Sequence, residues 1–165
     1  MSNREVIETF YQSFQRGDWK SMQACYHDHI EFSDPAFPNL KGSHAKAMWH
    51  MLASSAKDLV VTYSQVNANE TTGSCEWEAK YSFSRTGARV HNRIHATFEF
   101  RDGKIIRHSD KFDLTRWAGM ALGMPGKLLG WTPWMQNKIR ATAAASLAKF
   151  LAAHPEYTSP SSSAK

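Results

Sequence analysis

The fold is decided by residues 98–113, which read FEFRDGKIIRHSDKFD. Apolar and polar side chains alternate on both sides of Asp102-Gly103, a dipeptide that favours the two-residue turn of a β-hairpin. Similar strand-like runs precede it, separated by Thr72-Gly73 and Thr86-Gly87. We expect four strands, over residues 59–68, 73–84, 89–101 and 104–114, that form an antiparallel meander.

The last strand of this meander carries two polar side chains on its apolar face. Because side chains alternate across a strand, His108 and Asp110 share a face with Ile106 and Phe112. A carboxylate on an apolar face must be paired, hydrogen-bonded or raised in pKa, which is also how enzymes prepare an acid or a base. His108 and Asp110 are therefore candidate catalytic residues. The alternative is that they are exposed, or satisfy each other and a loop backbone.

The residues before the meander are mostly helical. Apolar residues recur at helical spacing over residues 4–16, a short helix follows over 19–26, and Ser43 can cap a third that extends to about residue 57. Residues 30–35 alternate like a strand that ends at a proline, so Asp34 lies where this strand exits. Asp34 is a third candidate catalytic residue. The alternative is that it only initiates a turn.

The net charge of +5 on 165 residues lies in the last third of a chain of one-domain length. Residues 1–110 hold thirteen Lys and Arg and thirteen Asp and Glu, whereas residues 111–165 hold seven against two. In this basic part, Thr132-Pro133 starts a helix to about residue 153. Its tryptophans and leucines suit a lid over an apolar pocket, which we favour over a membrane-surface segment.

Several function classes are excluded or not favoured. The chain has no glycine-rich phosphate loop, and its balanced first two-thirds give no reason to expect a nucleic-acid partner. No apolar run is long enough to span a bilayer and no secretory signal is visible, so we expect a cytoplasmic protein. Cys25 and Cys75 are expected to be buried free thiols. The histidine spacing matches no known metal-ligand set, so we expect neither a metal nor another cofactor.

A resemblance to a known family is carried by the order of elements and by FYQSF and GDW over residues 10–19, FSDP over 32–35, Gly42 and residues 98–113. In these features the sequence resembles the nuclear transport factor 2-like superfamily. Its SnoaL-like and ketosteroid isomerase-like branches are the most similar. The resemblance implies an α+β fold in which a cone-shaped, curved antiparallel sheet packs on N-terminal helices over residues 1–115. A helical extension over 116–154 would pack on or over the cone, and 155–165 would be a flexible tail. The resemblance also implies a homodimer through the sheet.

The resemblance carries part of a catalytic site. Asp34 matches the general base of the isomerases, which also precedes a proline. The tyrosine of their oxyanion pair falls on Phe10, with Tyr11 as a neighbouring substitute, and the protonated aspartate falls on Ala96. Both members of that pair are therefore missing, and steroid isomerisation by that mechanism is not expected.

A second branch is similar around Asp110. The segment HSDKFD resembles the stretch of limonene epoxide hydrolases in which an aspartate helps to activate water. The partner Arg and Asp of those enzymes would fall near Trp77 and Ala79, and neither residue can do that job. SnoaL-like polyketide cyclases use a His and an Asp on these strands, for which His108 with Asp110 is a counterpart without a fixed register.

We therefore expect a domain that binds a small, largely apolar molecule in the cone. It would carry out acid/base chemistry of the isomerase, cyclase or epoxide-hydrolase type with Asp34 and Asp110, and with His108 helping. The alternative is a non-catalytic domain of the same fold that binds a small ligand or another protein. The residues expected to line the pocket are Phe10, Tyr11, Trp49, Trp77, Tyr81, Asn92 and Phe98, although the aromatic members equally suit a packed core.

Overall fold

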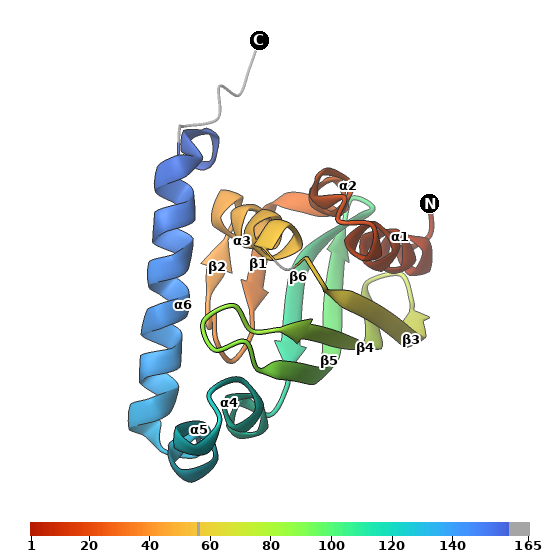
Figure 1. Ribbon diagram of the computed structural model, residues 1–165. Coiled ribbons are helices and arrows are strands. Elements are labelled where there is room, and N and C mark those ends of the chain that lie inside the picture. Colours follow the sequence, from red (N-terminus) through yellow and green to blue (C-terminus); the bar gives the residue numbers. More distant parts are fainter. Residues whose placement is uncertain (56, 159–165) are drawn as a thin grey trace.

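The computed structural model describes residues 1–55 and 57–158 as a curved sheet with helices on one face and a helical extension beside it (Figure 1). The elements in chain order are α1 (Asn3–Gln15), α2 (Trp19–Ala24), β1 (Tyr26–Ser33), β2 (Leu40–Lys41), α3 (Ser43–Ser55), β3 (Val60–Ala68), β4 (Thr72–Ser82), β5 (Arg89–Arg101), β6 (Lys104–Lys111), α4 (Leu114–Ala121), α5 (Met124–Leu129), α6 (Pro133–Ala153) and the 3-10 turn η1 (Pro155–Tyr157).

The strands form a single sheet in the order β2-β1-β6-β5-β4-β3. Strands β3 to β6 pair antiparallel in chain order, which confirms the predicted meander. Strand β1 pairs parallel with β6, with Phe32 opposite His108 and Ser33 opposite Ser109. This register directs the residue that follows β1, Asp34, toward the level of Asp110.

The hairpin between β5 and β6 has the predicted turn. Asp102 and Gly103 both have positive φ, 52° and 70°, as a type I′ turn requires. The pairing shifts by a residue between Glu99 and Phe100. As a result Ile105 is fully buried, whereas Ile106, predicted on the inner face, is half-buried.

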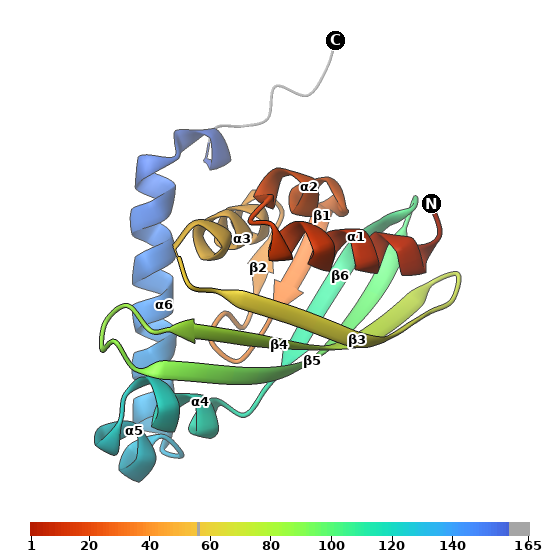
Figure 2. The same cartoon turned by 45° about the vertical axis from the view of Figure 1, so that its right-hand side comes forward.

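Helices α1, α2 and α3 cover the concave face of the sheet (Figure 2). Helix α1 begins at a capping box in which the Ser2 hydroxyl accepts from the Glu5 amide and the Glu5 carboxylate accepts from the Ser2 amide. The prediction of helix to residue 26 was wrong, because α2 ends at Ala24 and Tyr26 already belongs to β1. Ser43 is the first residue of α3 rather than its cap, and Gly42 precedes it with a φ of +52°.

The extension packs on the cone at several places. Helix α6 begins where predicted, with the Thr132 hydroxyl accepting from the Met135 amide. It runs along the α3, β1 and β2 side of the sheet, and α4 and α5 lie at the end away from α1 (Figure 1). Arg140 of α6 donates to the carbonyl of Pro35 at 2.9 Å, and Thr86 of the β4–β5 hairpin donates to the carbonyl of Ala121. The extension therefore joins the loop after β1 to the β4–β5 hairpin.

The borders of the extension differ from the predicted ones. Strand β6 ends at Lys111 instead of 114, because the Asp113 side chain caps α4 by accepting from the Arg116 amide. The flexible tail was predicted from residue 155, but Tyr157 is buried and its hydroxyl accepts from Gln23. Residues 159–165 of that predicted tail lie outside the described residues.

The remaining expectations concern thiols, membranes and partners. Cys25 and Cys75 are buried free thiols, as predicted. Within residues 1–55 and 57–158, no helix combines the length and apolar character that crossing a bilayer requires. The homodimer through the sheet stays a prediction.

Candidate functional site

A continuous chain of hydrogen bonds runs through the interior of the sheet. Trp49 Nε1 donates to the Tyr26 hydroxyl at 2.7 Å, and that hydroxyl lies 2.7 Å from Nδ1 of His108. His108 Nε2 lies 2.9 Å from Oδ1 of Asp110, which also accepts from Trp77 Nε1 at 3.3 Å. His108 is fully buried and Asp110 is 4% exposed, which confirms that both face inward.

The hydrogen-bond partners in this chain indicate which atoms carry the protons. The Tyr26 oxygen accepts from Trp49, so we assign the single hydroxyl hydrogen of Tyr26 to Nδ1 of His108. With this assignment Nε2 carries a ring proton and donates it to Asp110. The carboxylate form of Asp110 receives two such donors, and both reach Oδ1. Its Oδ2 makes no hydrogen bond within the described part of the chain.

Aromatic rings enclose His108. Trp49 stacks on the imidazole, with ring centroids 5.7 Å apart and planes 13° apart. The ring centroids of Phe98, Phe32 and Phe10 lie 4.5, 5.1 and 5.6 Å from that of His108. These rings exclude water, so the polarity of the interior is confined to the side that Asp110 faces.

Asp34 lies directly after β1 and has an unusual environment. Its Oδ1 accepts from the amides of Ala36 and Phe37, at 2.7 and 2.6 Å, and this turn fixes the carboxyl group. The residue keeps some solvent contact, yet burial of the carboxyl group raises its pKa to about 7. The negative charge of Asp110 acts in the same direction, and the pairing of Ser33 with Ser109 places Asp34 and Asp110 at the same level of neighbouring strands.

Two tyrosine hydroxyls lie near these carboxyl groups. Tyr81 accepts from Trp117 Nε1 of α4 at 2.8 Å, and burial, with the charge of Asp34 adding to it, raises the pKa of Tyr81. Tyr11 is fully buried, and its hydroxyl has no hydrogen-bond partner among the described residues. Burial, and then the charge of Asp110, hold the pKa of Tyr11 well above its ordinary value. Both hydroxyls therefore stay protonated and have a hydrogen to donate.

Asp34 and Asp110 have identical carboxyl groups, but the structure gives them different surroundings. Asp110 receives two side-chain hydrogen bonds on one oxygen, whereas burial raises the pKa of Asp34 to about 7. Each has one carboxyl oxygen on which no hydrogen bond is found among the described residues. Pairs of titratable groups with divergent surroundings are the usual basis of acid and base roles in one site. The site can thus accept a proton at one carboxyl group and supply one at the other.

The structure brings the three predicted catalytic residues to one region, but it distributes the predicted lining residues more widely. Phe10, Tyr11, Trp49 and Phe98 contact one another or His108 in the packed interior. Trp77 reaches Asp110, Tyr81 is half-buried near Asp34, and Asn92 is 8% exposed on the inner face of β5. That these residues line a ligand pocket stays a prediction.

Three contributors were missed. Tyr26 was assigned to a helix end, Cys75 lies beside the Tyr11 hydroxyl, and Trp117 of the extension orients Tyr81. No sequence signal could have found the Tyr26 contact, since 82 residues separate it from His108. Among the described residues, no group of three or more His, Cys, Asp or Glu could hold a metal ion.

The sequence matches the model of a SnoaL-like domain over residues 7–108. The chain belongs to the SnoaL-like domain family. This family lies within the nuclear transport factor 2-like superfamily, as the fold does. The comparison with curated proteins found no match.

Solved structures show the same fold at low sequence identity. TerC, co-crystallised with polyporic acid, superposes with a TM-score of 0.61 at 17% identity, covering 72% of this SnoaL-like domain and 96% of TerC. An LEH-like epoxide hydrolase of M. tuberculosis gives 0.61 at 18%, covering 77% and 95% of the two chains. IdmH of Streptomyces antibioticus, proposed to be a polyketide cyclase, gives 0.63 at 15%, covering 75% and 100%. These similarities establish the cone fold. They do not establish a reaction, which has to be inferred from the site.

Proposed function

We propose that this SnoaL-like domain binds a small, largely apolar molecule at Asp34 and Asp110 and catalyses proton transfer on it. The observation that carries the proposal is the pair of carboxyl groups on neighbouring strands, a half-buried one directly after β1 and a buried one on β6. One has a pKa of about 7, and the other receives two hydrogen-bond donors. Structural carboxylates are ordinarily paired with cations or fully hydrogen-bonded, and each of these has one oxygen without a described partner.

The proposed chemistry is the enolisation of a carbonyl compound. The Asp110 carboxylate takes a proton from the carbon next to the carbonyl group, and the electron pair of that C–H bond forms the enol double bond. Protonated Asp34 gives its proton to the carbonyl oxygen, and the Tyr81 hydroxyl can donate to the same oxygen. In an isomerase, Asp110 returns its proton to another carbon of a conjugated enol while Asp34 takes back the hydroxyl proton and the carbonyl group re-forms. In a cyclase, the enol carbon attacks a second carbonyl group, Asp34 takes back the hydroxyl proton, and Asp110 gives its proton to the new alkoxide oxygen. Such acid and base steps each contribute about 10²–10⁴-fold in rate.

His108 supports Asp110 in this scheme without touching the substrate. Its Nε2–H holds one carboxylate oxygen, and the Tyr26 hydroxyl fixes the tautomer in which that nitrogen is the donor. The free Oδ2 is thereby directed away from the imidazole. His108 is thus a positioning residue for the base.

The site residues support carbonyl chemistry more than epoxide hydrolysis. The solved structures of the same fold include both a proposed polyketide cyclase and an epoxide hydrolase. The Arg and Asp partners expected of a limonene epoxide hydrolase would fall near Trp77 and Ala79. Here Trp77 donates to Asp110 and Ala79 is buried apolar surface. Water activation by that three-residue set therefore has no counterpart.

A non-catalytic binding domain is the second candidate. The observation in its favour is that both ring nitrogens of His108 are satisfied within the protein, as in a structural network. Under this reading Asp110 completes the core and Asp34 only initiates a turn.

Deuterium exchange into an enolisable probe separates the two candidates. We would follow by NMR the incorporation of deuterium from D2O into 2-tetralone, a small apolar ketone, with and without the protein. The wild type should accelerate exchange above the buffer rate. Asp110→Asn should lower the protein-dependent rate by about 10²–10⁴-fold, and Asp34→Asn should lower it by at least about tenfold. Asp102→Asn is the matched control, since this exposed turn residue tolerates asparagine.

The binding of 2-naphthol, a planar apolar phenol, should be retained in both active-site variants and is followed by its fluorescence. Binding without any protein-dependent exchange in the wild type would support the non-catalytic candidate. Exchange that persists unchanged in Asp34→Asn and Asp110→Asn would overturn the roles assigned to them.

A further inference from the structure

An apolar patch lies at the corner between α5 and α6. Its five side chains are large, apolar and exposed: Met124 (61%), Leu128 (64%), Leu129 (42%), Trp131 (67%) and Trp134 (61%). Figure 1 shows α5 and the start of α6 at the end of the molecule remote from α1. Clusters of this kind on a folded surface mark interaction sites, whereas single exposed apolar residues need no explanation.

Local contacts hold the patch outward. The opposite side of α6 packs on the protein, where Met135 and Ile139 are 6% and 8% exposed. On the outer side, Trp131 Nε1 donates to the carbonyl of Leu128 at 3.1 Å, and the Lys138 ammonium lies 5.2 Å from the Trp134 ring centroid. The tryptophans are therefore positioned by α5 and α6 themselves and are left without a covering element.

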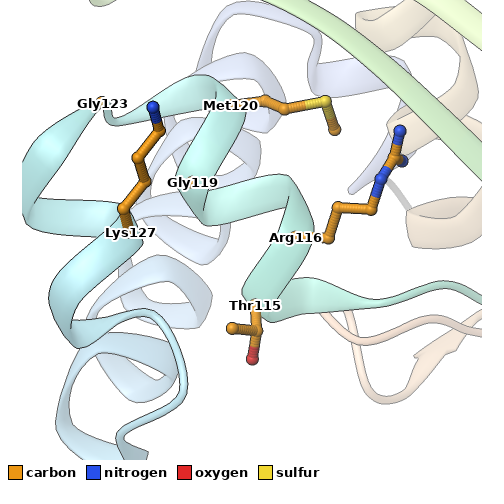
Figure 3. A pocket seen from close by; sticks show the side chains of 6 residues that line it. All are labelled: Thr115, Arg116, Gly119, Met120, Gly123 and Lys127. Atoms are coloured by element: carbon orange, nitrogen blue, oxygen red, sulfur yellow. The ribbon is translucent and has the colours of Figure 1, made fainter.

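The charge around the patch has one sign. Residues 114–155 contain no Asp or Glu and five Lys or Arg. Lys138 borders the patch beside Trp134, and Lys127 lies between the apolar residues of α5. A surface groove of about 530 Å3 opens between α4 and α5, and Arg116 and Lys127 are among its lining residues (Figure 3). Apolar side chains and cations therefore meet at one corner.

We propose that this corner docks on an anionic membrane surface. Trp131, Trp134 and Leu128 would enter the boundary between headgroups and acyl chains, where amphipathic tryptophan rings are favoured. Lys127 and Lys138 would meet the lipid phosphates and carboxylates. Association would be peripheral, because no described helix can cross a bilayer. The proposal holds whether or not the domain is an enzyme.

The charge favours a membrane over a second copy of the chain. In a two-fold dimer the same patch meets itself, so Lys127 and Lys138 of one copy would approach those of the other. No acidic residue between 114 and 155 could compensate them. An anionic bilayer supplies the opposite charge together with an apolar layer.

Vesicle flotation of the full-length protein tests the proposal. We expect the protein to float with vesicles of phosphatidylcholine and 30% phosphatidylserine (a composition of about physiological surface charge), and much less with phosphatidylcholine alone. Trp131→Ser/Trp134→Ser should weaken binding by at least about tenfold. Lys127→Gln/Lys138→Gln should weaken it by about fivefold per lysine. Lys80→Gln/Lys104→Gln removes the same charge from exposed strand positions and should bind like the wild type.

A second readout does not depend on the loss of binding. Brominated acyl chains should quench the tryptophan emission of the bound wild type, and Trp131→Phe/Trp134→Phe should lose this quenching while it still floats. The substituted side chains are exposed, so thermal unfolding should be unchanged.

Absence of flotation, or flotation unaffected by the serine variant, would overturn the proposal. A dimer in solution that the serine variant converts to a monomer, without vesicle binding, would assign the patch to a second copy instead.

Discussion

Asp34 and Asp110 are identical side chains that the fold places in different surroundings. Asp110 accepts from a histidine and a tryptophan on one oxygen, whereas Asp34 accepts only backbone amides and is raised in pKa by burial. The distinction depends on the parallel pairing of β1 with β6, which brings the two residues to one level. At the residue scale, the candidate chemistry is this difference in environment.

The raised pKa of Asp34 has a consequence for stability. An acid whose pKa is about 7 in the folded state and 3.8 in the unfolded state binds more protons when folded between those pH values. The free energy of unfolding therefore falls as pH rises from about 4 to 7. Asp34→Asn removes the charge but keeps an oxygen for the amides of Ala36 and Phe37. We expect it to be more stable than the wild type by about 2–4 kcal/mol at pH 8 and equally stable at pH 3.5.

Urea unfolding at the two pH values measures this difference, with Asp102→Asn as the matched control on an exposed carboxyl group. A stabilisation of the same size at pH 3.5 and pH 8 would contradict the raised pKa.

Tyr26 is the residue on which the buried chain depends. Tyr26→Phe would leave Trp49 Nε1 and His108 Nδ1 without a partner in an interior that excludes water. Buried unsatisfied polar groups cost about 1–3 kcal/mol each, so we expect a loss of about 2–4 kcal/mol in unfolding free energy. Tyr63→Phe is the control, because among the described residues the Tyr63 hydroxyl bonds only the exposed Gln12 side chain. Losses of equal size in urea unfolding of the two variants would refute the network.

At the scale of elements, the contact between α4 and α5 depends on a glycine. A Cβ on Gly126 would lie 1.9 Å from the carbonyl oxygen of Ala118, which is backbone and cannot move aside. Gly126→Ala should therefore destabilise the protein by about 2–3 kcal/mol and change the emission of Trp117. For Gly119→Ala in the facing helix, the added Cβ would lie 3.4 Å from the flexible Lys127 side chain and at ordinary contact distance from the Lys127 backbone, so this variant should be neutral or slightly stabilising. Equal melting temperatures of the two variants would contradict the close approach.

Local sequence patterns predicted most helices and strands. They failed where pairing with a strand far along the chain determines the structure. The two-residue period placed His108 and Asp110 inward, and Thr132 marked the start of α6. The same period misplaced Ile106, because a shift in pairing is set by the partner strand. Tyr26 was wrongly assigned to a helix. It belongs to a strand that forms by pairing with β6, and this partner lies far along the chain. The candidate acids could therefore be predicted, but not the hydrogen bonds that distinguish them.

At the scale of the whole molecule, the extension is part of the core. Leu147 of α6 is 5% exposed and packs in the same apolar cluster as the sheet and α1. Leu147→Ala should cost about 2–4 kcal/mol and keep a single transition, with far-UV circular dichroism and tryptophan emission coinciding. Leu128→Ala, at a 64% exposed site on α5, should be near neutral. A separate early transition in the Leu147 variant would show that the extension folds independently.

The most direct test of the account is an NMR titration of the aspartate carboxyl carbons. Asp34 should titrate with a midpoint near pH 7, and this midpoint should fall in Asp110→Asn because the repulsion from the second carboxylate is removed. Burial, the larger cause, remains in that variant, so the midpoint should stay above the ordinary range of an aspartate. A midpoint near 4 for Asp34, unchanged by Asp110→Asn, would show that the two carboxyl groups do not interact and would contradict the acid and base roles proposed for them.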